Sequence, residues 1–393
     1  MKLAQRMSRL GTETAFEVLV RAKALEAQGR EVVHLEVGEP DFDTPSNIIE
    51  AACKALHSGH THYVPSAGIP ALREAIATEI SKTRAIPVNA NQVVVTPGAK
   101  PIMFFVILAL ADEGDEVMYP NPGFPIYESM INFVGAKPVP LPLLEEREFT
   151  FDIDRMRQQV TPHTKLIIIN SPHNPCGSIM TKNDLAAVAE VAIQNDIMVL
   201  ADEIYCRDVY EGKFESITQF PGMPERTIIL DGFSKTYAMT GWRMGYGVMP
   251  EPLAPHISKL MTNSNSCTAA FTQVAGIEAL QGPQDEPYKM VAAFKERRNL
   301  IVKGLNEIPG VHCLLPKGAF YVFPNFKEVI KRGKFASTKA FADALLQEAG
   351  VAALSGTAFG QYGEGYLRFS YANSIPNIQK ALERIADFVA KHS

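Results

Sequence analysis

The sequence predicts an α/β fold, a three-layer sandwich with a mostly parallel seven-stranded sheet, together with a smaller α+β domain. From residue 92 onward, short apolar runs alternate with stretches of helical periodicity such as 100–110 and 181–194. The runs are continuous and rich in Val and Ile, which is typical of strands covered by helices on both faces. At 393 residues the chain is long enough for two domains, each with its own core. We expect the seven strands at residues 92–96, 116–119, 137–140, 166–170, 197–201, 227–230 and 245–249.

Further elements lie on either side of this alternating region. Residues 14–28 have apolar side chains at helical spacing and are followed by Gly29, so we expect an amphipathic helix that ends there. Residues 288–305 indicate a long helix that carries many Lys, Arg and Glu residues on one side and links the two domains. Short strands with intervening helices are expected beyond it, at residues 316–324, 351–354 and 366–371.

These elements divide the chain into three regions. We expect an N-terminal segment (1–45) that packs with the small domain, a large domain (46–285) and a small C-terminal domain (286–393). In sheets of this kind ligands bind beyond the carboxyl ends of the strands. The functional residues are therefore expected in the segments that follow the strands of the large domain.

Composition and charge indicate small-molecule ligands. A net charge of −5 and a pI near 6.0, without a long basic run, argue against nucleic acids and anionic membranes as partners. No stretch approaches the roughly 20 apolar residues of a membrane span, and residues 1–10 lack the apolar core of a signal peptide, so we expect a cytoplasmic protein. The five cysteines are scattered without a C-x-x-C spacing, so we expect no disulfide or zinc framework and reduced cysteines in the core.

Three histidines, His57, His60 and His62, could suggest a metal site. Their spacing crosses Ser58 and Gly59, which is typical of a helix end followed by a turn, and no cluster of cysteines or carboxylates accompanies them. We therefore expect no metal.

Several segments after the strands could hold a ligand. The segment T-P-G-A-K (96–100) lies between a strand and a helix, where free N–H groups and the helix dipole favour an anion, although an ordinary turn would look the same. Phe124 lies in a constrained turn and could stack on a flat ring or belong to the core. Asp202 ends a strand, where it could be a helix N-cap or could keep the nitrogen of a pyridine ring protonated.

The segment D-G-F-S-K-T-Y-A-M-T-G-W-R-M-G (231–245) is the strongest functional candidate. Lys235 lies among small and hydroxyl residues after an apolar run, and an amine of this kind can form a Schiff base once it is deprotonated. Ser234 and Arg243 could bind a phosphate. The triplet S-K-T alone would favour a solvated surface lysine.

A second cation lies within an apolar run, in the segment Y-L-R-F-S (366–370). An unpaired charge there would be costly, so Arg368 must meet a carboxylate. From the residues alone, that carboxylate could belong to the protein or to a substrate.

These segments together resemble the class I aminotransferases, aspartate-aminotransferase-like enzymes of pyridoxal-phosphate fold type I. The match includes S-K-T-Y followed by G-W-R-M-G and, earlier in the chain and in the same order as in the family, G-E-P-D-F-D-T-P (38–45), H-Y-V-P (62–65), N-S-P-H-N-P-C-G (170–177) and D-E-I-Y (202–205). Ser171 departs from the family's N-P-x-N-P-x-G pattern. Together with the Arg368 segment, the resemblance covers nearly the whole chain.

The resemblance implies pyridoxal 5′-phosphate as the coenzyme, bound in the large domain as an imine of Lys235. Freed from it, Lys235 would move the proton from the substrate's α-carbon to the coenzyme. The implied coenzyme contacts are Gly98, Ala99, Lys100, Phe124, Asn174, Asp202, Tyr205, Ser234, Lys235, Arg243 and, from the neighbouring subunit, Tyr63. The implied substrate contacts are Gly38, Asn174 and Arg368.

The resemblance also implies an L-amino acid donor, a 2-oxo acid acceptor such as 2-oxoglutarate or pyruvate, and a homodimer. Tyr63 and residues 263–267 would complete the neighbour's site, although a core tyrosine is the alternative for Tyr63. No second arginine can be assigned to a side-chain carboxylate, so the sequence does not choose the amino acid, and we expect a fairly broad specificity.

Other functions on this scaffold remain open at this point. A carbon–sulfur or β/γ-elimination lyase would use the same Lys235, Asp202 and Arg368, because the first carbanion is shared. A non-catalytic coenzyme-sensing regulator would need a DNA-binding appendage, and no helix-turn-helix segment fits before residue 30. A nicotinamide dehydrogenase would need G-x-G-x-x-G after the first strand, and that pattern is absent.

Overall fold

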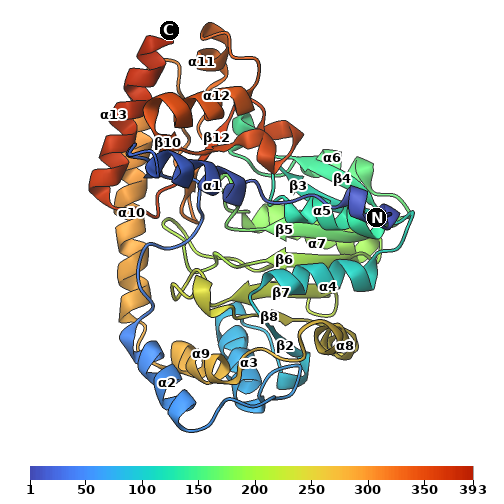
Figure 1. Ribbon diagram of the computed structural model, residues 1–393. Coiled ribbons are helices and arrows are strands. Elements are labelled where there is room, and N and C mark those ends of the chain that lie inside the picture. The colour runs from blue at the N-terminus through green and yellow to red at the C-terminus, as the bar shows by residue number, and fades with distance from the viewer. Residues whose placement is uncertain (393) are drawn as a thin grey trace.

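Seven strands form the central sheet of the protein in the computed structural model, which describes residues 1–392 (Figure 1). Their order is β2-β8-β7-β6-β5-β3-β4, and only β8 runs antiparallel to its neighbours. The predicted mostly parallel seven-stranded sheet is confirmed, with small differences at the strand ends. The strands are β2 (Val93–Thr96), β3 (Glu116–Asn121), β4 (Lys137–Pro142), β5 (Thr164–Asn170), β6 (Met198–Asp202), β7 (Thr227–Gly232) and β8 (Gly245–Val248).

Helices cover both faces of this sheet. They are α2 (Ser46–His57), α3 (Pro70–Arg84), α4 (Lys100–Leu110), α5 (Ile126–Val134), α6 (Ile153–Gln159), α7 (Lys182–Gln194), α8 (Ala254–Asn265) and α9 (Ala270–Gln281). Because successive side chains of a strand point to opposite faces, Leu166 and Ile168 of β5 share a core with α4, α5 and α8. Ile167 and Ile169 share another core with α6 and α7. Towards β2 and β8, this second face is covered by α2, α3 and α9.

The C-terminal part of the chain, drawn in orange and red in Figure 1, forms a second and smaller group of elements together with the N-terminal α1 and β1. It contains an antiparallel sheet of order β11-β12-β9, and a strand pair in which β1 and β10 run parallel. The strand expected at 351–354 is two short strands, and only two residues of the expected strand 316–324 are regular. The elements are α1 (Ala15–Glu26), β1 (Val33–His34), α10 (Asp285–Asn306), β9 (Tyr321–Val322), α11 (Lys327–Arg332), α12 (Thr338–Ala344), β10 (Val351–Ala352), β11 (Leu354–Ser355), β12 (Leu367–Ser370) and α13 (Ile375–Lys391).

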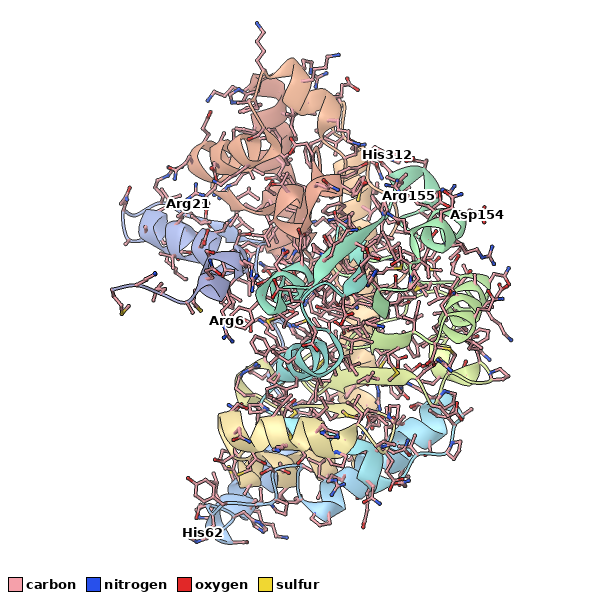
Figure 2. The ribbon with its side chains drawn as sticks, turned by 90° about the vertical axis from the view of Figure 1, so that its right-hand side faces the viewer. Arg6, Arg21, His62, Asp154, Arg155 and His312 are labelled. Atoms are coloured by element: carbon pink, nitrogen blue, oxygen red, sulfur yellow. The ribbon has the colours of Figure 1, made fainter. Side chains whose placement is uncertain are left out.

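We propose the domain division expected from the sequence, with the N-terminal segment packed on the small domain. In its favour, β1 pairs with β10, and α1 lies beside the C-terminal elements in Figure 1. Arg21 of α1, labelled in Figure 2, forms an ion pair of 2.5 Å with Asp343 of α12. The helix α10 runs along the molecule from α9 to α13 and connects the two regions.

The cysteines depart in part from expectation. All five are free, and Cys176, Cys206 and Cys313 are buried. Cys53 is exposed and Cys267 is half-buried, so the expectation of core positions is wrong for these two. Within residues 1–392, none of the helices combines the length and the apolar character that a bilayer crossing needs.

Candidate active site

The carboxyl ends of the parallel strands β5, β6 and β7 lie side by side in the large sheet. Their register pairs Asn170 with Asp202 and Asp202 with Leu230. The Asn170 amide donates to the backbone oxygen of Asp202 at 2.9 Å, and its oxygen accepts from the backbone N–H of Asn174 at 2.9 Å. The loops that follow these strands therefore start together, and Lys235 comes from the third of them.

Asp202 is a buried carboxylate held by neutral donors. The Tyr127 hydroxyl donates to Oδ2 at 2.5 Å, and the backbone N–H of Ile204 donates to Oδ1 at 3.2 Å. Burial raises the pKa of Asp202 to about 6, although both hydrogen bonds lower it. Within residues 1–392 no cationic side chain forms an ion pair with Asp202. The carboxylate thus has an uncompensated negative charge that a cationic ligand could neutralise.

The amine of Lys235 lies in a largely apolar enclosure. Nζ donates to the backbone oxygen of Gly38 at 2.6 Å and lies 5.9 Å and 5.7 Å from the ring centroids of Tyr205 and Phe320. Burial lowers the pKa of Lys235 to about 8, against the opposing effect of nearby carboxylates. An amine with this pKa is readily deprotonated near neutral pH, as nucleophilic and proton-transfer chemistry require.

Arg368 brings a buried guanidinium to the same site. Nη1 donates to Asn174 Oδ1 at 3.2 Å, and Nη2 donates to the backbone oxygen of Glu36 at 2.5 Å. The guanidinium lies over the rings of Tyr321 and Phe359, at 4.4 Å and 5.0 Å. Nε is buried without a hydrogen-bond partner, and no carboxylate of residues 1–392 forms an ion pair with this arginine. A structural carboxylate therefore does not neutralise Arg368, which leaves it free to bind an anionic ligand.

The start of α4 faces Arg243 and could bind an anion. Gly98 has a φ of +84°, and a Cβ at this position would lie 2.4 Å from Arg243 Nη2. The glycine thus allows the guanidinium to approach the N-terminal turn of α4, where backbone N–H groups and the helix dipole favour negative charge. Ala99 is the N-cap residue of α4, and Ser234 lies partly buried beside Lys235.

The side chain of Lys100 is engaged elsewhere. Its amine forms an ion pair with Glu13 and lies 5.4 Å from the ring centroid of Phe124. Any contact of Lys100 with an anion at the start of α4 would thus come from its backbone N–H. Phe124 is partly buried and packs edge-on against Tyr127, with ring centroids 5.7 Å apart.

Two tyrosines of this site were not predicted. Tyr127 binds Asp202, and the hydroxyl of Tyr321 is 2.8 Å from that of Tyr205. Tyr127 lies shortly after Phe124, so the segment around Phe124 could have indicated this tyrosine. Nothing in the apolar run around Tyr321 indicates that its hydroxyl pairs with that of Tyr205. A Cβ at Gly38 would lie 2.2 Å from the Tyr321 hydroxyl, so a glycine is needed here for the loop to come this close to Tyr321.

Tyr63 does not join the other residues within one chain. Its side chain is 88% exposed, so the alternative of a core tyrosine is wrong. Figure 2 shows the neighbouring His62 at the edge of the molecule, far from the C-terminal elements.

Comparisons with known proteins agree with this geometry. The family described as aminotransferase class I and II matches residues 30–385. The chain is similar to the aspartate aminotransferase of Bacillus subtilis (strain 168), with 39% identity over 100% of both chains. It is similar to aromatic-amino-acid aminotransferase 2 of Thermococcus litoralis, with 40% identity over 91% of this chain and 92% of the other. The structure of a Thermus thermophilus aspartate aminotransferase with maleate matches with a TM-score of 0.93 and 36% identity, over 98% and 99% of the two chains.

Proposed function

The chain belongs to the class I and II aminotransferase family, and from this premise we propose how its own residues serve the reaction. The protein is a pyridoxal-phosphate-dependent aminotransferase, which moves the amino group of an amino acid to a 2-oxo acid, and the lyase alternative is not favoured. The observation that carries the residue assignments is the convergence of Asp202, Lys235 and Arg368, three buried or partly buried charges that lack an ion-pair partner among residues 1–392.

The residues fit pyridoxal phosphate. The start of α4, with Gly98, Ala99 and the N–H of Lys100, would bind the phosphate together with Ser234, Arg243 and a neighbour's Tyr63. Asp202 would meet the pyridine nitrogen, and Phe124 would stack on the ring. Asn174 and Tyr205 would bind the phenolic oxygen. When bound, the coenzyme supplies an aldehyde carbon that condenses with amines and a ring that takes up electrons from the substrate's α-carbon.

Each charged residue then has a distinct task. Asp202 keeps an anion beside the ring nitrogen, and Arg368 holds the substrate's carboxylate by its guanidinium fork, with Gly38 and Asn174 beside it. Lys235 would hold the coenzyme and, when free, would move the proton from the substrate's α-carbon to the coenzyme. With a pKa of about 8, about a tenth of the amine is neutral at pH 7, enough for a general base. Such a positioned base typically contributes about 10²–10⁴-fold to the rate.

The test is the replacement Lys235→Ala. We expect it to abolish turnover and the visible absorbance band of the lysine-bound coenzyme. Lys295→Ala is the matched control, because this amine only donates to the Tyr210 backbone oxygen at 3.2 Å, and it should keep both. Retention of a normal band by Lys235→Ala would refute the assignment.

For the substrates, we propose a broad range of L-amino acids as donors and 2-oxoglutarate or pyruvate as acceptor. The relatives' names include both aspartate and aromatic amino acids, and Arg368 would recognise the carboxylate that all of these share. A panel of twenty amino acids, each followed in single half-reactions by coenzyme absorbance, would define the range. An amine without a carboxylate that reacts as fast as its parent amino acid would exclude this role for Arg368.

We also propose a homodimer in which Tyr63 and residues 263–267 complete the partner's site, because Tyr63 extends 88% exposed from the chain. Mixing Tyr63→Phe subunits with inactive Lys235→Ala subunits should restore activity, since one hybrid site would be intact. If Tyr63 acted within its own chain, mixing would give no gain. We propose a cytoplasmic location, because all five cysteines are free, as in a reducing compartment.

A further inference from the structure

Asp208 is a further aspartate of this region, and two hydrogen bonds fix its backbone. Its backbone N–H donates to the Tyr205 oxygen at 2.8 Å, and its backbone oxygen accepts from the N–H of Ala319 at 2.8 Å. Tyr205 and Phe320, which follows Ala319, are the residues whose rings lie 5.9 Å and 5.7 Å from Lys235 Nζ. The backbone of Asp208 is therefore anchored to the two segments that enclose the amine.

Within residues 1–392, the carboxylate of Asp208 forms no hydrogen bond or ion pair. Its side chain is 2% exposed, Oδ2 is buried without a hydrogen bond, and no ion pair reaches it within residues 1–392. Two other buried carboxylates nearby are paired, because Arg84 contacts Glu203 at 2.9 Å and Asp231 at 3.2 Å. An unpaired buried carboxylate opposes folding, so its presence requires an explanation other than stability.

The hydroxyl groups around Asp208 are engaged with other acceptors. Tyr210 and Tyr371 both donate to the backbone oxygen of Ala319, and Tyr321 is paired with Tyr205. Asp208 interacts electrostatically with Tyr210, Tyr321 and Tyr371. It also interacts with Asp231, which carries a like charge.

Lys235 is the cation that remains. The charged groups that act on Lys235 are Glu39, Arg368, Asp208 and Glu13, in decreasing order of effect, and only Asp208 among the three carboxylates is fully buried. A buried charge acts through low dielectric and is little screened by water or salt. Asp208 is therefore the carboxylate best placed to act persistently on this amine.

We propose that Asp208 is a positioning residue that serves as the counter-charge of Lys235 and sets the pH at which this amine changes protonation state. The proposal rests on the proposed function of Lys235. Burial raises the pKa of Asp208 to about 7, and Lys235 opposes this shift. Burial lowers the pKa of Lys235 to about 8, and Asp208 opposes that shift. The two groups thus change protonation state over the same neutral range, and each opposes the shift in the pKa of the other.

The holoenzyme provides the first test. Asp208→Asn removes the charge and keeps the shape, so we expect the pH midpoint of the coenzyme's visible absorbance to move to lower pH, by on the order of one unit. Asp208→Glu keeps the charge and should keep the midpoint near that of the wild type. An unchanged midpoint in Asp208→Asn would overturn the proposal.

The protein without coenzyme provides an independent test. Trace acetylation with acetic anhydride across pH, read by mass spectrometry of the Lys235 peptide, measures the pH at which this amine becomes reactive. We expect Asp208→Asn to lower that pH, while exposed Lys182 on α7 is unaffected in the same sample. Equal midpoints for Lys235 in the wild type and the variant would refute the coupling.

A reciprocal measurement covers the case in which Asp208→Asn does not fold. In Lys235→Met, the loss of the cation should raise the pKa of Asp208, as read by infrared or carbon NMR of labelled aspartate, and no rise would overturn the proposal. These outcomes are separable from a failure of the proposed function. If Lys235 did not bind the coenzyme, Lys235→Ala would keep the absorbance band, whereas the labelling midpoint would still report the coupling.

Discussion

The unpaired carboxylate of Asp208 predicts a penalty on folding that grows as pH rises from about 3.8 to about 7. Burial raises the pKa of Asp208 from an ordinary value of 3.8 to about 7. Because the folded pKa lies above the unfolded one, the penalty is absent below pH ~3.8, grows with pH and is complete above pH ~7. At about 1.4 kcal/mol per pKa unit, a shift of roughly three units corresponds to about 4 kcal/mol. Between pH 5 and pH 8 the penalty grows by about 2.5 kcal/mol.

Asp208→Asn removes the titration and should therefore gain stability over the wild type with rising pH. Replacing the carboxylate by an amide has a pH-independent effect on folding that cancels in the difference between two pH values. The lower pKa of Lys235 in this variant adds to the expected gain. Urea unfolding of both coenzyme-free proteins at pH 5 and pH 8, at one protein concentration, measures this difference. The Asn variant should gain about 2.5 kcal/mol relative to the wild type between these values.

Asp154→Asn is a suitable control for this experiment. Asp154, labelled on the rim in Figure 2, is 85% exposed and pairs only with Arg157, so its loss should change stability equally little at both pH values. If the stability difference between Asp208→Asn and the wild type were the same at pH 5 and pH 8, Asp208 would not be an ionised, unpaired group in the folded protein.

Three further predictions concern the site. Arg368→Lys should raise KM about tenfold or more for every amino acid alike, because a single charge-assisted hydrogen bond is worth about 1.5–3 kcal/mol and lysine lacks the fork; an effect on one substrate only, in the half-reaction panel, would count against it. Asp202→Asn should lower kcat by on the order of 10²-fold or more and change coenzyme Kd far less, as kinetics and equilibrium dialysis can separate; near-normal turnover would disprove the role at the ring nitrogen. Gly98→Ala should weaken coenzyme binding and lower the free energy of unfolding by about 1 kcal/mol or more, since φ is +84° and Arg243 would have to move; calorimetry and coenzyme titration check both.

The fold could be predicted because its signal is local and repeated. Strands such as β5 and β6 are short apolar runs between helical patterns, and their type follows from composition and length alone. The small domain was predicted less precisely, since β9 and β10 are two residues long and are defined by partners distant in sequence. Residues 316–324 look like one strand, yet most of them are irregular.

The site could be predicted only where a motif carries it. Lys235, Asp202 and Arg368 lie in segments whose residue patterns resemble those of the family, and the structure brings all three together. Tyr127 and Asp208 depend on contacts across the fold, and no spacing in the sequence shows that a hydroxyl 75 positions from Asp202 donates to it. The burial of Asp208, which is 2% exposed, likewise becomes visible only in the structure.

The pairing of buried charges explains why Asp202, and not a neighbouring acid, is suited to a cationic ligand. Asp231 also lies near the end of its strand and precedes Lys235 by only four residues. Arg84 forms ion pairs with both Asp231 and Glu203, at 3.2 Å and 2.9 Å. Asp202 receives only the hydroxyl of Tyr127 and a backbone N–H, which stabilise a negative charge without cancelling it. A protonated ring nitrogen beside Asp202 would thus face an anion that no cation of residues 1–392 pairs with.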